Sequence, residues 1–253
     1  MDSSAAASVA VVDTDTPVTN DAPRVLAQWE TADTRSHAEV LAPAVESVLA
    51  AADLQATDLD GVLVGTGPGP FTGLRAGLAT ARTLGYAWKL PVYGMCSLEA
   101  IAHDVAVLPT AARPAEFVVA TDARRREVYW AVYRTTQRDA ESGNPVGKYL
   151  MGGARATVVQ GPSVGPAADL PALPVYGRGA GLYTEELAGA VLAPIPGARL
   201  AAPPTQWQPT AASLGLAAGD VVNSGGVLST NTTPLYLRES DAKVPGPRKK
   251  ATS

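Results

Sequence analysis

Two kinds of hydrophobic spacing alternate along the first hundred residues. Short apolar runs at residues 7–12 and 25–29 have the length and composition of strands. Residues 36–52 place Leu41, Val45 and Val48 at helical spacing, which predicts an amphipathic helix with one side towards a core. Pro43 lies inside that span, so we expect either a kink there or a regular helix that begins near Ala42.

The next segment predicts a βαβ unit. The apolar runs 61–65 and 91–95 have the length of buried strands, and a long helical stretch to about residue 88 separates them. Two strands joined by a crossover helix run parallel in one sheet. Ser97 and Glu99 are typical of the start of another helix, which we expect to reach Val105.

After a stretch rich in proline and alanine, residues 107–115, the pattern starts again. Residues 117–122 and 127–134 predict two strands joined by a turn, and residues 157–159 predict a further strand. Helices are expected at residues 182–191 and 209–222. We therefore expect an α/β protein with two lobes, residues 1–108 and 115–208. The last helix would return to the first lobe, and residues 239–253 would form a disordered tail.

Composition narrows the functional classes. The chain of 253 residues is 46% hydrophobic and 17% charged, which is typical of a protein with packed cores. Its net charge of −4 disfavours an autonomous nucleic-acid-binding protein, because such proteins are usually basic. A single cysteine excludes an intrachain disulfide and a multi-cysteine zinc site. With no continuous apolar span and no signal-peptide pattern, we expect a cytoplasmic protein without membrane contact.

A glycine-rich loop joins the first parallel strand to its helix. Gly65, Gly67, Gly69 and Thr72 mark this loop, and exposed backbone N–H groups at such a place can hold an anion. The loop is not a Walker A motif, because no lysine follows its last glycine, and its two prolines remove N–H donors. The alternative is a rigid turn that directs the helix.

The helix that follows carries a stripe of small residues, Gly73, Gly77, Ala81 and Gly85, at every fourth position. Glycine weakens a helix by up to about 1 kcal/mol per residue relative to alanine, so a compensating close contact is expected. One interpretation packs the stripe on the protein's own sheet. The other packs the stripe, or the flanking face formed by Leu74, Leu78 and Ala79, against another protein.

Candidate catalytic groups are sparse. His37 is expected in the first turn of a helix, where capping or a partner contact fits better than catalysis. Cys96 follows a predicted strand with His103 nearby, and an inert buried thiol is the simpler interpretation. No cluster has the spacing of metal ligands.

Two further motifs are weak. Arg124, Arg125 and Arg126 form the tip of a predicted hairpin, which either contacts phosphate or is a solvated turn. The glycines at 177, 179 and 181 lack the third glycine of a dinucleotide fingerprint, since Leu182 stands there.

Longer blocks resemble one family. The stretch from Val64 through Gly67-Pro-Gly-Pro-Phe-Thr-Gly73 to Ala87 closely resembles the TsaB (YeaZ) family. The resemblance continues through residues 36–43, 90–94, 97–100, 122–131 and 234–238, in the family's order.

The resemblance implies an actin-like (ASKHA) fold with two RNase H-like lobes. It implies a non-catalytic relative of TsaD that acts with TsaD and the ATPase TsaE to make threonylcarbamoyladenosine (t6A) at tRNA position 37, from threonylcarbamoyl-AMP supplied by TsaC-type synthases. This chain would bind no cofactor tightly, and ATP or ADP would bind to the complex. TsaD would dock on helices of the first lobe, and the chain would pair with itself without TsaD. The interface residues would be His37, Leu41, Val45, Val48, Gly73, Leu74, Gly77, Leu78, Ala81 and Gly85.

The resemblance also bears on chemistry. TsaD-like relatives carry an H-x-x-x-H metal pair after the second parallel strand, and the corresponding residues here are Ser97 and Ile101, which cannot hold iron or zinc. Two enzyme classes remain as alternatives. One is a peptidase or glycopeptidase that uses Cys96 or a serine. The other is an actin-fold phosphotransferase that uses Asp2 and Asp122.

The N-terminus departs from the family pattern. Family members begin with an apolar strand before a turn like Asp2-Ser3-Ser4, and this strand is absent here. We expect the true start to lie upstream of Met1, because a missing central strand would leave backbone groups unpaired.

Overall fold

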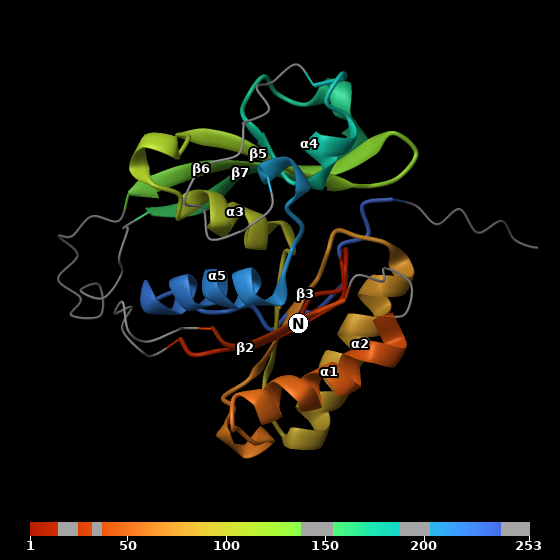
Figure 1. Ribbon diagram of the computed structural model, residues 1–253, viewed down its shortest axis with the longest axis vertical. Coiled ribbons are helices and arrows are strands. Elements are labelled where there is room, and N and C mark those ends of the chain that lie inside the picture. Colours follow the sequence, from red (N-terminus) through yellow and green to blue (C-terminus); the bar gives the residue numbers. More distant parts are fainter. Residues whose placement is uncertain (15–24, 32–36, 138–153, 188–202, 239–253) are drawn as a thin grey trace, which may run out of the picture.

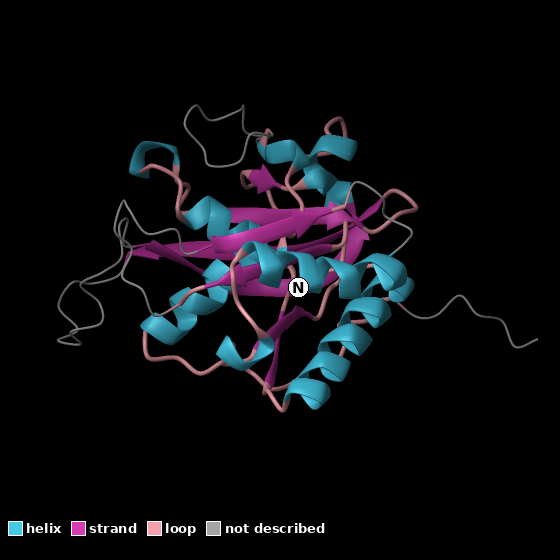
Figure 2. Cartoon of the chain, turned by 60° about the horizontal axis from the view of Figure 1, so that its bottom comes forward, coloured by secondary structure: helices cyan, strands magenta, loops and turns pink. Residues whose placement is uncertain are grey.

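The computed structural model describes residues 1–14, 25–31, 37–137, 154–187 and 203–238 (Figure 1). The predicted tail, residues 239–253, and the last four residues of the predicted helix 182–191 lie outside these ranges. Where the chain is described it is a mixed α/β fold, and seen from a second direction helices lie on either side of the strands (Figure 2). The division into two lobes stays a prediction.

Two short sheets form the first part of the fold. Strands β1 (Ser8–Val12) and β2 (Val25–Glu30) pair antiparallel, and β3 (Val62–Gly65) and β4 (Val92–Met95) pair parallel, as the βαβ pattern predicts. The first two residues lie between these sheets. The Met1 amino group donates to the Leu63 carbonyl at 2.7 Å, and Asp2 and Ser8 exchange two backbone hydrogen bonds.

Helices α1 (His37–Ala51) and α2 (Phe71–Trp88) pack together below these strands in Figure 1. Leu41, Val45 and Val48 of α1 are buried, as their spacing predicts. The helix begins at His37 and not near Ala42, so Pro43 lies in its second turn. The missing N–H of a proline there removes one intrahelical hydrogen bond without ending the helix.

A four-stranded sheet forms the second part, in the order β7-β6-β5-β8. Strands β5 (Glu116–Asp122), β6 (Glu127–Gln137) and β7 (Ala154–Pro166) are antiparallel neighbours, and β8 (Val175–Tyr176) pairs parallel with β5. Helix α3 (Leu98–Ala106) packs on this sheet around the aromatic side chains of Phe117, Tyr133 and Tyr176. Short 3-10 turns lie at Ala56–Asp58, Thr110–Ala112, Ala167–Asp169 and Pro204–Gln206.

Two expectations for this part were wrong. Strand β7 is much longer than residues 157–159, because eleven-residue β6 provides hydrogen-bond partners along most of it. The helix expected at residues 182–191 is absent from residues 183–187, which form a bend and turns, and the glycine-rich segment 177–181 before it is helical instead. Most of it is itself helix α4 (Arg178–Leu182), since the small residues let the helix approach β5. A Cβ on Gly179 would lie 2.9 Å from the Ala120 carbonyl carbon.

Helix α5 (Ala211–Asn223) lies between β1 and α3 (Figure 1). Thr210 caps it by accepting a hydrogen bond from the Ser213 N–H at 3.1 Å. Ser8 of β1 accepts from the Ala211 N–H at 2.9 Å, which anchors the helix start to the first sheet. No helix of the described residues is long and apolar enough to cross a membrane.

Candidate functional site

The glycine loop is a tightly packed turn against residues 1–4. A Cβ on Gly65 would lie 1.8 Å from Asp2 Oδ2, and one on Gly69 would lie 2.5 Å from the Ser4 carbonyl oxygen. Gly67 has φ +93°, which favours glycine, and its N–H donates to Ser97 Oγ at 3.1 Å. These contacts support the rigid-turn alternative.

Asp2 is the centre of a buried hydrogen-bond network that sequence reasoning missed. Its Oδ1 accepts from the Ser4 N–H at 2.8 Å and the Ser4 hydroxyl at 2.6 Å, and its Oδ2 accepts from the Ser97 hydroxyl at 2.5 Å. The side chain is fully buried, so it fixes the chain's first turn. The Asp-x-Ser spacing, typical of an Asx turn, was the available signal.

The small-residue stripe of α2 faces the protein's own interior. A Cβ on Gly77 would lie 2.2 Å from Ser3 Oγ, and one on Gly85 would lie 2.2 Å from Val92 Cγ2. The other predicted interface residues of α2 are buried as well: Gly73, Leu74, Leu78 and Ala81. The side chain of His37 lies outside the described residues. That this end of the fold binds a partner stays a prediction, but a partner would contact the exposed neighbours of these residues.

The exposed faces of α1 and α2 define that surface. On α2 it includes Arg75, Arg82 and Tyr86, whose side chain is 89% exposed. The exposed residues of α1 include Glu39 and Glu46. We call these faces together the α1–α2 surface. It combines an exposed aromatic ring with charges of both signs, a composition that suits a protein interface.

The arginine tip adopts an uncommon backbone. Arg124, Arg125 and Arg126 have φ of 63°, 57° and 61°, and all three are exposed. The Asp122 side chain accepts from the Arg124 N–H at 2.7 Å, and Arg238 forms an ion pair with Glu127 beside it. Three consecutive left-handed non-glycine residues are energetically unfavourable, which makes this tip a candidate contact site.

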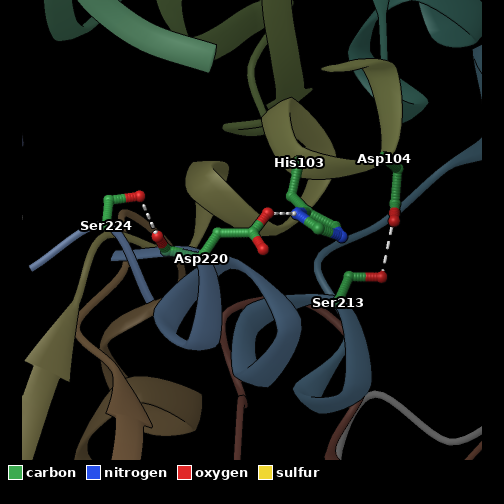
Figure 3. Close-up of polar contacts among 5 residues, drawn as sticks. All are labelled: His103, Asp104, Ser213, Asp220 and Ser224. Carbon is green, nitrogen blue, oxygen red and sulfur yellow. Dashed lines mark hydrogen bonds and ion pairs between the residues drawn. The ribbon is translucent and has the colours of Figure 1, made fainter. Parts of the chain in front are cut away.

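Cys96 does not have the character of a nucleophile. Burial, reinforced by the nearby Glu99 carboxylate, raises the pKa of the Cys96 thiol to about 12. At neutral pH the thiol therefore stays protonated, and the thiolate that would attack a substrate is almost absent. His103 is engaged elsewhere, because its Nδ1 lies 3.1 Å from Asp220 Oδ2 on α5 (Figure 3). The peptidase alternative thus lacks support at this cysteine.

The α3–α5 contact is polar at two points. Beside the His103–Asp220 pair, the Ser213 hydroxyl donates to Asp104 Oδ2 at 2.9 Å, and Figure 3 shows both pairs bridging the two helices. Sequence reasoning missed Asp220. The signal was a single acid in the otherwise uncharged residues 211–223.

Ser97 and Ile101, at the positions of the metal pair in TsaD-like relatives, are both fully buried. Ser97 is hydrogen-bonded to Asp2, and Ile101 packs in the core with Phe117. Among the residues that the structure describes, no three His, Cys, Asp or Glu side chains are grouped so that they could hold a metal ion.

Known sequences match part of the chain. Residues 25–155, just over half of the chain, match the family described as TsaD: tRNA N6-adenosine threonylcarbamoyltransferase. A segment of 109 residues is 53% identical to an uncharacterized protein of Mycobacterium tuberculosis H37Rv, and covers 43% of this chain and 48% of that protein. A segment of 105 residues is 36% identical to the tRNA threonylcarbamoyladenosine biosynthesis protein TsaB of Escherichia coli K12, over 42% of this chain and 43% of that protein. The chain spans about half the length of these curated relatives.

Solved structures match nearly the whole chain. A crystal structure from Pseudomonas aeruginosa, described as an uncharacterized protein with similarity to peptidase YEAZ, superposes with a TM-score of 0.66. Its sequence is 26% identical, over 94% of this chain and 97% of that one. YeaZ from the same organism shares the fold with a TM-score of 0.66 at 23% identity. Together with the match to the TsaD family, these similarities show that the chain belongs to the TsaB (YeaZ) family.

Proposed function

We propose that this chain is a non-catalytic subunit that binds a TsaD-type threonylcarbamoyltransferase and supports t6A synthesis at position 37 of tRNA. The names of its TsaB relatives support a role in t6A biosynthesis. The observation that carries the non-catalytic role is the burial of Ser97 and Ile101 in the interior, where TsaD-like relatives carry metal ligands. The chain would then supply a docking surface, and its partner the transferase chemistry.

We place the docking site on the α1–α2 surface. The buried stripe of α2 holds the helix close to Ser3 and Val92, so the outer face of the helix has a fixed position and shape. Tyr86 is the most exposed large hydrophobic side chain of that face, and aromatic side chains contribute strongly to protein interfaces. The same surface would form the self-dimer in the absence of TsaD.

The remaining partners are proposed at the level of the complex. TsaE and ATP or ADP would bind to the complex. Residues 1–4 pack against the glycine loop, which supports placing the nucleotide elsewhere than on this loop. The exposed arginine tip, Arg124 to Arg126, is the proposed tRNA contact, because arginine neutralises phosphate groups. The cytoplasm is the compartment in which such a complex would act.

Co-purification with the cognate TsaD tests the docking site. Tyr86→Asp should weaken the complex by at least about tenfold, since it removes an aromatic contact and introduces a charge. Leu182→Asp is the matched control. This residue is 47% exposed on α4, at the opposite end of the molecule (Figure 1), and the variant should leave the affinity unchanged.

A second experiment tests activity by measuring t6A in tRNA with mass spectrometry of nucleosides. We expect modification only when TsaD is present, and reduced modification with Tyr86→Asp. Modification of tRNA by this chain in the absence of TsaD would overturn the non-catalytic role. Equal affinity of the two variants for TsaD would overturn the docking site alone.

A further inference from the structure

A cavity of about 390 Å³ lies where α3, α5 and β7 meet. Its wall is largely apolar, with Met95, Ala106, Val158 and Val221 among the lining residues. Cavities of a few hundred Å³ with apolar walls and few polar groups are typical small-molecule sites. The cavity lies between elements of both parts of the fold and is separate from the α1–α2 surface.

Besides the Cys96 thiol, four ionisable side chains line the cavity: Glu99 and His103 of α3, Arg155 of β7 and Asp220 of α5. Because Nδ1 of His103 is paired with Asp220, these two side chains largely satisfy each other. Glu99 accepts a long hydrogen bond of 3.3 Å from the Tyr133 hydroxyl. Three of the four groups therefore have a side-chain partner within the described protein.

Arg155 is the exception. Its guanidinium makes no hydrogen bond or ion pair with any residue that the structure describes, although its charge is close enough to Glu99 to lower the pKa of that carboxyl. Burial is the larger effect and raises the pKa of Glu99 to about 7. A protonated Glu99 carries no charge, and Arg155 then has no counter-ion among the residues that the structure describes.

We propose that this cavity binds a small monocarboxylic acid, with its carboxylate on Arg155 and its short apolar body against the Met95–Val221 wall. Arginine suits a carboxylate, because its planar fork of N–H donors can bind both oxygens. A dianion such as phosphate is disfavoured, since Glu99 and Asp220 would repel its second charge. A cavity of this volume accommodates an apolar ligand body of roughly four to eight carbon atoms.

Methionine-methyl NMR tests this proposal on the intact chain. The protein has three methionines, and Met95 lines the cavity whereas Met1 packs between the first sheets and α1. Titration with 4-methylpentanoate should shift the Met95 methyl signal saturably, with a Kd on the order of 1 mM for so small a ligand. The Met1 signal should stay in place. The neutral probe 4-methylpentanamide should bind at least about tenfold more weakly.

Two arginine variants distinguish binding of the carboxylate to the Arg155 guanidinium from nonspecific binding. Arg155→Gln should weaken binding of 4-methylpentanoate at least about tenfold. The matched control is Arg134→Gln, which removes an arginine of the same sheet whose guanidinium pairs with Glu116 at 2.7 Å. This control should change the Kd less than twofold.

The pH dependence gives an independent readout. The ionisable groups facing the ligand carboxylate are Glu99, His103, Asp220 and Arg155, with Cys96 and Tyr133 beside them. Binding should strengthen from pH 8 to pH 6, because Glu99 gains a proton and no longer repels the anion. Glu99→Gln, which keeps the neutral shape and can still accept from Tyr133, should bind tightly at pH 8 and lose most of this dependence.

The proposal is overturned if the Met95 methyl stays in place, or moves together with Met1. It is also overturned if the acid and its amide bind equally, or if Arg155→Gln and Arg134→Gln behave alike. None of these outcomes depends on TsaD or on tRNA.

Discussion

The glycine loop and the α3–α5–β7 cavity organise polar groups in opposite ways. Around the loop, the carboxylate of Asp2 accepts three hydrogen bonds, and added Cβ atoms would collide with backbone or buried side chains. In the cavity, Arg155 has no partner among the described residues and space remains between the elements. In the glycine loop the Asp2 carboxylate is therefore satisfied by hydrogen bonds within the protein. In the cavity, the donors of Arg155 are still available to bind a ligand. The glycines that stand out in the sequence therefore have a structural role. The candidate binding site is formed by charged residues that lie far apart in the chain.

The largest effect on stability should come from adding one methyl group to the glycine loop. In Gly65→Ala the new Cβ would lie 1.8 Å from Asp2 Oδ2 and 2.6 Å from Ser97 Oγ, so the buried network must break. We expect a loss of about 3–5 kcal/mol in the free energy of unfolding, measured by urea denaturation. Gly165→Ala is the matched control, because no atom lies within 4 Å of its added Cβ. Similar stability of both variants would contradict this description of the loop.

Glu99 should give the next largest effect, and it depends on pH. Its folded-state pKa of about 7 is above the usual 4.5, so the folded protein holds the proton more tightly than the unfolded chain. The stabilisation of the folded state by this proton is fully present below pH 4.5 and is lost as the pH rises through 7. At pH 8, Glu99→Gln should therefore be more stable than the parent chain by up to about 3 kcal/mol. The two proteins should converge below pH 4.5, and a constant difference from there to pH 8 would contradict the assignment.

Ser97→Ala should cost less, about 2 kcal/mol, because it leaves one oxygen of Asp2 and the Gly67 N–H without their buried partner. Thermal unfolding measures the change. Ser47→Ala, on the exposed face of α1, is the control and should lie within about 0.5 kcal/mol of the parent. Equal melting temperatures for both variants would show that Ser97 does not support the network.

The last test concerns the reactivity of Cys96, and no change in stability is expected from it. With the thiol pKa raised to about 12, alkylation by iodoacetamide at pH 8 should be slower than that of free cysteine by about a thousandfold. Mass spectrometry of the folded and the urea-unfolded protein measures this ratio. Rapid labelling of the folded protein would reopen the peptidase alternative.

The sequence predicted the elements better than their contacts. The βαβ unit, α3, α5 and the hairpin at Arg124 were predictable, because local hydrophobic periodicity and turn residues determine them. The length of β7 was not, since its pairing partner β6 precedes an intervening segment of the chain. The fate of the small-residue stripe also depended on tertiary contacts, because periodicity does not say which surface a helix face meets.

The cavity was even less accessible from the sequence. Glu99 and Arg155 are 56 positions apart, and each looks like an ordinary surface charge in its own segment. Only the packing of β7 beside α3 brings them to one space. A local sequence pattern does not predict a contact between residues so far apart. Asp220, by contrast, stands out in the sequence as the single acidic residue of α5.

The bond between Ser8 and the start of α5 has a consequence for how the protein is made. The two hydrogen-bonded residues, Ser8 and Ala211, are 203 positions apart in the chain. At a translation rate of about 5–20 residues per second, the ribosome needs at least roughly ten seconds to add the second after the first. During that interval β1 lacks its α5 cover, so nascent chains should be most prone to aggregate, and most dependent on chaperones, before α5 leaves the ribosome.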